Sequence, residues 1–230
     1  MSTFQQACQT IREAVYGLKC TTPIGNNLAN STTGTGFMIA SGVLATAAHV
    51  IHFESNLNGA VHQSFQAIRA PDIGQIMERA QLIAEDTARD IAFLRITNPR
   101  STQSVVLEPN ILSIGTICGS MGFPLSFLNP QGGFMLDLRF QGAFISSFNT
   151  QAQFYETDSL MYKGASGCPG FTVNGHVFGM HNRSINSGAI FKTTDASTKT
   201  TDASIETTEK ATNETTTKSR SSPNSATKTN

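Results

Sequence analysis

Gly164-Ala165-Ser166-Gly167-Cys168-Pro169 is the stretch of this sequence that says most about its fold. It holds a serine between glycines, and glycines permit tight turns that can direct backbone N–H groups into the space beside the hydroxyl. A nucleophile with hydrogen-bond donors beside it is what acyl-transfer chemistry needs. Because Gly, Ser and Pro also cluster in ordinary turns, an inert turn serine is the alternative interpretation.

Two upstream segments carry the partners that such a serine would need. Residues 34–50 contain two apolar runs joined by Ser41-Gly42, a pattern that predicts a β-hairpin ending near His49. Asp90 directly precedes a third apolar run, which predicts a strand with an acid at its mouth. The chain order is therefore His, Asp, Ser, one of the known orders of a catalytic triad.

These segments together resemble the trypsin-like serine peptidases, most closely the HtrA/Deg-like branch. The matching runs are Thr46-Ala47-Ala48-His49, Asp90-Ile91-Ala92-Phe93-Leu94, Gly115–Pro124, Thr157-Asp158 with Gly164–Pro169, and Gly175–Met180. The resemblance covers roughly residues 10–192, and three ordered motifs are far more specific than any one of them.

Many short apolar runs separated by Gly, Pro, Asn and Ser predict an all-β sandwich or barrel. The resemblance implies two six-stranded antiparallel β-barrels with a cleft between them. A helix is expected within residues 4–14, and the polar run 26–33 is expected to be a loop. The predicted strands are 15–20, 34–40, 43–50, 64–69, 81–84, 91–96, 115–119, 134–140, 143–148, 154–157, 170–173, 177–181 and 189–192.

The composition changes abruptly near the end of the chain. Residues 193–230 consist almost entirely of Thr, Ser, Ala, Asn and charged residues, which cannot bury enough surface to offset their ordering entropy. We therefore expect a peptidase domain over residues 1–192 and a disordered tail over 193–230. HtrA-type proteins commonly carry PDZ domains after the peptidase, and this sequence contains none.

The resemblance implies a role for each residue of the triad. Ser166 would be the nucleophile and His49 the general base, because imidazole titrates near neutral pH. Asp90 would orient His49, and Asp86 is the competing acid. Asp90 is preferred because it directly precedes the apolar strand, whereas Asp86 is expected to cap the turn at 87–89.

The backbone N–H groups of Gly164 and Ser166 would form the oxyanion hole. Two positions depart from the common family pattern. Ala165 replaces Asn or Asp, which is tolerable because that side chain supplies no donor. Cys168 replaces Gly, and a cysteine would strain the loop if this position required a positive φ.

The residues before the serine and after Gly179 would wall the primary specificity pocket. The candidates are Leu160, Met161, Tyr162, His181, Asn182 and Arg183. The Gly-x-His pattern at His181 looks like glutamyl endopeptidases and picornavirus main proteases, in which this histidine binds a Glu or Gln side chain. The alternatives are a strand histidine paired within the fold and a pocket for a medium apolar residue. No acid stands at Leu160, which disfavours basic substrates.

Composition and charge exclude several other classes of protein. The 16 basic and 16 acidic side chains balance without a basic cluster, so no nucleic-acid footprint is present. No apolar run is long enough to span a membrane, and no secretory signal is visible, which favours an intracellular protein. Cys8, Cys20, Cys118 and Cys168 lack metal-ligand spacing and are expected to be reduced thiols.

The sequence therefore predicts a serine endopeptidase that acts on polypeptides without a cofactor. One alternative is a catalytically impaired member of the fold that binds peptides as a scaffold. Another is a self-processing protease that cleaves mainly its own chain. Because HtrA relatives are often trimers, a homo-oligomer is a further expectation from the resemblance.

Overall fold

The computed structural model describes residues 3–25, 28–72, 77–124, 127–128, 134–135, 137–159 and 162–182. The helices of this part are α1 (Phe4–Arg12), the single-turn α2 (Ala48–Ile51) and two 3-10 turns, η1 (Phe53–Ser55) and η2 (Ala70–Asp72). No helix in the described residues is long and apolar enough to cross a membrane. The predicted strand at 189–192 and the predicted tail at 193–230 lie outside the described residues.

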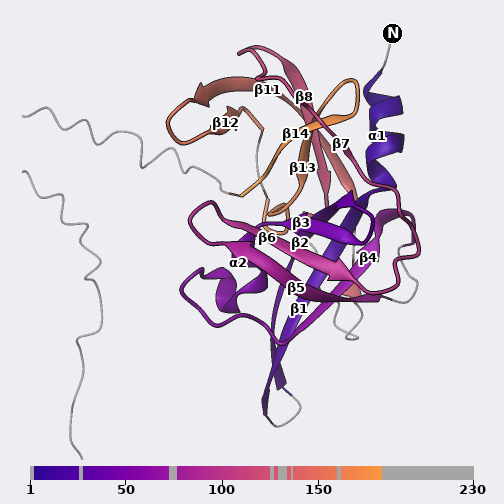
Figure 1. The fold of residues 1–230 in the computed structure, drawn as a ribbon, viewed down its shortest axis with the longest axis vertical. Coiled ribbons are helices and arrows are strands. Elements are labelled where there is room, and N and C mark those ends of the chain that lie inside the picture. Colours follow the sequence, from indigo (N-terminus) through magenta and orange to yellow (C-terminus); the bar gives the residue numbers. More distant parts are fainter. Residues whose placement is uncertain are drawn as a thin grey trace, which may run out of the picture. The chain divides into compact units, whose positions relative to one another are not determined.

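Six antiparallel strands close into a barrel in the first half of the chain (Figure 1). In their order around the barrel they are β1 (Val15–Gly25), β2 (Leu28–Ala40), β3 (Val43–Thr46), β6 (Ile91–Ile96), β5 (Glu78–Asp86) and β4 (Ser64–Arg69). The β2–β3 hairpin turns at Gly42, whose φ of +72° suits glycine. The hairpin predicted between residues 34 and 50 is confirmed, but its second strand ends at Thr46, and His49 lies in the helical turn α2 instead of at the end of the strand.

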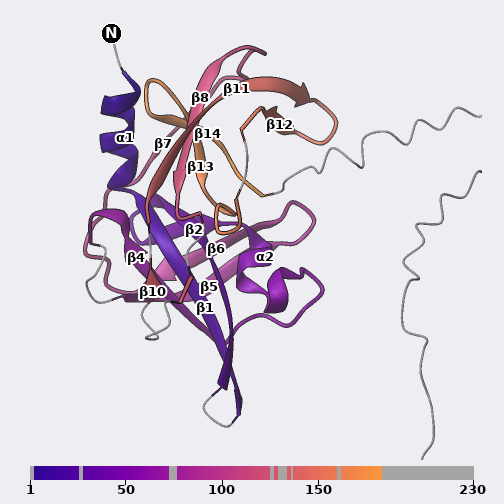
Figure 2. The same ribbon diagram turned by 180° about the vertical axis from the view of Figure 1, so that it is seen from behind.

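A second six-stranded sheet follows in the second half of the chain (Figure 2). Its order is β12 (Phe154–Thr157), β11 (Arg139–Asn149), β8 (Ile117–Gly122), β13 (Pro169–Thr172), β14 (His176–Met180) and β7 (Val106–Leu107). A two-stranded ribbon, β9 (Phe127–Leu128) with β10 (Phe134–Met135), completes the described strands. The prediction of an all-β fold built from two six-stranded antiparallel barrels is confirmed in the closed first barrel and the six-stranded second sheet, with one difference: β7 pairs with β14 in parallel.

The loop predicted over residues 26–33 is wrong for residues 28–33. These residues begin β2 and pair with β1, as in Ser31 opposite Thr21. Thr32 is buried and donates its hydroxyl hydrogen bond to the carbonyl of Val50. Backbone pairing and side-chain hydrogen bonds can satisfy polar residues in a strand, so polarity alone does not identify a loop. Asn26 and Asn27 lie outside the described residues.

The predicted leading helix is confirmed as α1, which starts at a capping box. The hydroxyl of Thr3 accepts the N–H of Gln6, and the Gln6 side chain accepts the N–H of Thr3. Ala7 and Ile11, one turn apart, form its buried face. They pack into the second of two apolar cores.

This second core joins the two sheets. Phe37 and Ala45 enter it from the barrel, while Phe123, Phe171 and Val177 enter it from the other half of the chain. The first core fills the barrel interior with buried side chains such as Leu18, Met38, Leu44 and Leu94. Apolar contact therefore fixes the β2–β3 hairpin against the end of β8 and against β13.

Two residues of β1 test how strongly the barrel depends on its core. Leu18 is fully buried, whereas Ile24 on the same strand is 60% exposed. We expect Leu18→Ala to lower the free energy of unfolding by about 3 kcal/mol, because it removes buried methyl groups and leaves a cavity. Ile24→Ala should change it by less than about 0.5 kcal/mol. Urea denaturation followed by circular dichroism measures both, and equal effects would contradict the barrel assignment.

Candidate active site

His49 and Asp90 meet because two barrel strands are neighbours. β3 leads directly into α2, which carries His49, and Asp90 lies immediately before β6. The two strands are antiparallel, with Thr46 opposite Ala92, so the end of one lies beside the start of the other. The backbone repeats this link, because the N–H of Ala48 donates to the carbonyl of Asp90 at 3.1 Å.

Both carboxylate oxygens of Asp90 bind His49. Oδ1 accepts the backbone N–H of His49 at 2.9 Å, and Oδ2 lies 2.8 Å from the ring Nδ1. Asp90 is 2% exposed and has a φ of +57°, a left-handed conformation that aspartate tolerates better than most residues. A carboxylate can only accept, so Nδ1 carries the ring proton and Nε2 of the neutral ring is left as an acceptor.

Ser166 reaches this pair from the other half of the molecule. It lies in the loop before β13, the strand that pairs with both β8 and β14. Its Oγ is 2.7 Å from Nε2 of His49, the ring nitrogen that faces away from Asp90. The serine hydroxyl can therefore donate to the imidazole, and the three side chains form one hydrogen-bonded chain.

Two backbone N–H groups of the loop around Ser166 have no acceptor among the described residues. The N–H groups of Ala165, Gly167 and Cys168 donate to Tyr162, His181 and Ala165, respectively. Those of Gly164 and Ser166 donate to no residue that the structure describes. These two are the amides predicted for the oxyanion hole, so they are available to a substrate oxygen.

Cys168 does not strain this loop. The positive φ angles fall on Gly164 (+93°) and Gly167 (+85°), while the described non-glycine residues with positive φ are Ser55, Asp90 and Gln153. The strain predicted for Cys168 is therefore absent. Its side chain is 2% exposed, and burial raises the pKa of its thiol to about 12, so the thiol stays protonated and is a poor nucleophile.

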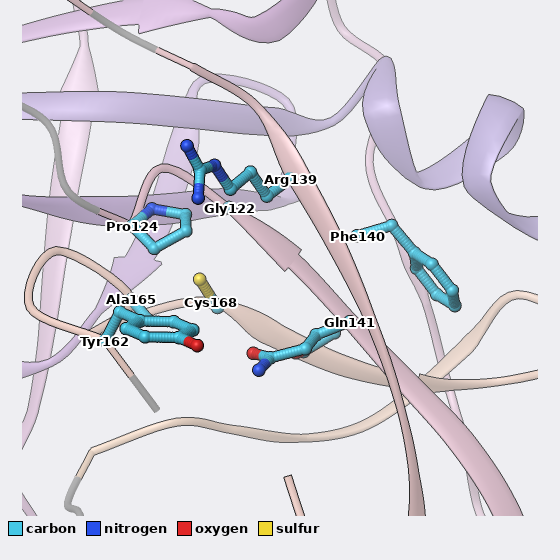
Figure 3. A pocket seen from close by; sticks show the side chains of 9 residues that line it. Gly122, Pro124, Arg139, Phe140, Gln141, Tyr162, Ala165 and Cys168 are labelled. Carbon is cyan, nitrogen blue, oxygen red and sulfur yellow. The ribbon is translucent and has the colours of Figure 1, made fainter. Parts of the chain in front are cut away.

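A cavity of about 110 Å³ lies on the Ala165 and Cys168 side of the loop. In Figure 3 the Cys168 sulfur, the Tyr162 ring, the Pro124 ring and the Arg139 guanidinium surround this space. Tyr162, a predicted specificity residue, therefore lines this cavity and does not line the cleft beside His49.

A larger, open cleft of about 490 Å³ lies beside His49 and Asp90. Asn182, which the sequence nominated, lines it together with a loop that the sequence analysis missed. The lining residues of that loop are Ser55, Asn56, Leu57 and Asn58. The sequence did carry a signal for this loop, namely turn-forming residues shortly after His49. A loop only a few residues from His49 must lie close to it in space.

The remaining predicted site residues are only partly described. His181 pairs with the serine loop through its backbone, accepting from Gly167 at 2.7 Å and donating to Cys168 at 2.9 Å. Burial lowers the pKa of its imidazole to about 4, so the ring is neutral at physiological pH. Leu160, Met161 and Arg183 lie outside the described residues.

Asp86, the competing acid, and His52, three residues after His49, both make contacts away from the hydrogen-bonded side chains of Ser166, His49 and Asp90. Asp86 accepts the N–H of Arg89 at 3.1 Å and pairs with its guanidinium, as expected for a turn cap. His52 is buried and bridges the carbonyl of Gly59 and the carboxylate of Glu85.

Comparison with known proteins agrees with this geometry. A family model described as a trypsin-like peptidase domain matches residues 34–180, which include His49, Asp90 and Ser166. The chain belongs to the trypsin-like peptidase family. No curated protein matches the sequence.

Among solved structures, the fold of this peptidase is similar to the serine endoprotease from Yersinia pestis. The TM-score is 0.61 at 18% sequence identity, which shows a shared fold. The match covers 80% of this chain and 59% of the Yersinia chain. The peptidase therefore spans about three fifths of that protein's length.

Gly167 provides a test of how tightly the peptidase packs around its serine. A Cβ there would lie 1.9 Å from the carbonyl oxygen of Thr35, whereas a Cβ at Gly115 would meet nothing within 4 Å. Both glycines have a φ near +85°. Gly115→Ala should therefore cost only the backbone penalty of about 1–2 kcal/mol.

Gly167→Ala carries the same backbone penalty plus a collision with the barrel, so we expect a clearly larger loss of stability. Thermal denaturation of the two variants compares them directly. Equal losses would mean that the loop does not press against β2.

Proposed function

We propose that this peptidase is a serine endopeptidase that hydrolyses peptide bonds with Ser166, His49 and Asp90. The observation that carries the proposal is the hydrogen-bonded chain from Asp90 through His49 to Ser166, at 2.8 and 2.7 Å. Family membership supports the same chemistry. The strain argument for an impaired, peptide-binding member of the fold rested on Cys168, and the angles of the loop remove that argument.

In the first step, Ser166 Oγ attacks the carbonyl carbon of the substrate while its proton moves to Nε2 of His49. Asp90 stabilises the imidazolium that forms, because its Oδ2 accepts the Nδ1–H bond. The C–N bond then breaks, and the amine leaves with the proton from Nε2. A water molecule repeats the sequence on the acyl-enzyme and releases the acid.

The free N–H groups of Gly164 and Ser166 would bind the oxygen that becomes negative in the tetrahedral intermediate. Such donors are already oriented before the reaction begins, so no free energy is spent on turning them toward the oxygen as its charge develops. The buried Asp90 binds Nδ1 of His49, so Nε2 faces Ser166 and can accept its proton. No cofactor is needed for any of these steps.

For specificity, we propose a preference for Gln before the cleaved bond, with His181 as its partner. The backbone of His181 pairs with the serine loop, and the pKa of its imidazole is lowered to about 4, so the ring is neutral at physiological pH. A neutral imidazole can donate to or accept from an amide without burying a charge. A Glu carboxylate would lack the counter-charge that makes its burial favourable. Polypeptides with hydrogen-bonding residues next to the cleaved bond would suit the cleft beside His49, because asparagine side chains line it.

A fluorophosphonate probe tests the nucleophile. We expect the wild-type protein to be labelled on Ser166 and Ser166→Ala to be unlabelled. His49→Ala should label at least about a thousandfold more slowly, because the serine then lacks its base. Ser159→Ala is a control at another serine and should label like the wild type. A folded wild-type protein that does not react would contradict the proposal.

Peptide libraries that vary the residue before the cleaved bond test the specificity. We expect cleavage after Gln to exceed cleavage after Glu, with a ratio that stays flat from pH 6.5 to 8.5, where a Glu side chain of ordinary pKa, about 4.3, is ionised. The imidazole of His181 has a pKa of about 4, so it is already deprotonated and neutral throughout this pH range. His181→Leu should move the preference toward medium apolar residues. A preference for Lys or Arg, or an unchanged His181→Leu profile, would refute the assignment.

A further inference from the structure

Thr35 on β2 is the residue that connects the barrel to the serine loop. It is fully buried and lies between Gly34 and Gly36, far from Ser166 in the sequence. Its backbone N–H donates to the carbonyl of Ser166 at 2.8 Å. Its own carbonyl accepts the hydroxyl of Thr46, on the neighbouring strand β3, at 2.7 Å.

The hydroxyl of Thr35 makes two further hydrogen bonds whose directions are determined. The backbone N–H of Phe123 can only donate, so Oγ1 is its acceptor, at 3.0 Å. The hydroxyl hydrogen is then free to donate to the carbonyl of Gly164, at 3.1 Å. One buried side chain therefore links the barrel, the end of β8 and the loop that carries Ser166.

Two of these hydrogen bonds go to Gly164 and Ser166, the residues whose N–H groups have no acceptor among the described residues. Thr35 binds the carbonyls of both Gly164 and Ser166, and each carbonyl belongs to a rigid peptide plane. The N–H side of each plane is also bound, Ala165 to Tyr162 and Gly167 to His181. The Ser166 N–H lies in the peptide plane between these two, and the Gly164 N–H lies in the plane directly before the first. Holding both planes therefore restricts the direction of both N–H groups.

We propose that Thr35 is a positioning residue for the oxyanion hole, acting through the carbonyl of Gly164. The inference rests on the proposed peptidase function. Thr35 contacts no reacting atom, so its effect is on how well Gly164 and Ser166 aim their donors in the transition state. It should alter kcat much more than KM, because a substrate binds in its ground state before charge develops on the oxygen.

Thr35→Val tests the proposal because valine keeps the shape of threonine and loses only the hydroxyl. The Gly164 carbonyl is then free to turn. We expect kcat to fall about 10- to 100-fold, less than for complete loss of an oxyanion donor, with KM within about threefold of the wild type. The rate of fluorophosphonate labelling should fall in parallel. Thr35→Ser keeps the hydroxyl and should restore kcat to within about threefold of the wild type.

Thr46→Val is the matched control. Thr46 is equally buried and its hydroxyl binds the same residue, but it touches neither loop carbonyl. Thr35→Val loses two buried hydrogen bonds and Thr46→Val loses one, so both should lose melting temperature, Thr35→Val somewhat more, while only Thr35→Val should lose kcat. Rates are measured well below the melting temperature of each variant. Should Thr35→Val not fold, Thr35→Cys keeps a weaker donor and should give an intermediate rate.

A Thr35→Val enzyme as active as the wild type would overturn the proposal. So would losses of kcat that follow melting temperature equally in Thr35→Val and Thr46→Val, because the role would then be structural only. An inactive wild type is a different result: it would overturn the proposed function, and this role with it.

Discussion

The contact between Thr35 and the serine loop is the constraint on which the rest of this structure depends. His49 and Asp90 follow and precede strands of the barrel, whereas Ser166 lies in the loop before β13 of the second sheet. Two hydrogen bonds from Thr35, to Ser166 and to Gly164, hold the loop against the barrel. A buried hydrogen bond contributes only about 1 kcal/mol net, but an orphaned buried partner costs about 1–3 kcal/mol. The arrangement is therefore strongly favoured over a loop that has moved away.

Apolar packing makes this contact possible. The core that joins the sheets brings Phe37 and Ala45 of the β2–β3 hairpin against Phe123 and Phe171. Phe37 lies two residues after Thr35, and Phe123 donates its N–H to the Thr35 hydroxyl. Hydrophobic burial is not directional, so it sets the approach of the two halves, and the hydrogen bonds then define their register. Gly167 allows the closest approach, because any side chain there would collide with the Thr35 carbonyl.

Burial also decides which groups near the serine can react. Desolvation raises the pKa of Cys168 and lowers that of His181, so both are neutral at physiological pH. Asp90 is equally buried, but each of its oxygens has a hydrogen-bond donor from His49. The Asp90 carboxyl group is thus held toward His49, where a mechanism would use it, whereas the thiol of Cys168 is protonated and passive.

The sequence by itself determined the β-rich fold, the leading helix, the hairpin before His49 and the set of residues that could form a triad. These signals are local: apolar runs, apolar residues at helical spacing near the start of the chain, and glycines around a serine. Tertiary structure alone decided that Asp90 meets His49, that the Gly164 and Ser166 amides have no acceptor in the described part of the chain, and that residues 55–58 line the cleft. It also decided that residues 28–33 form a strand and that β7 runs parallel to β14. Thr35 is the clearest case, because its partners are 88 and 129 positions away, and a polar residue in a strand carries no local mark of what it will bind.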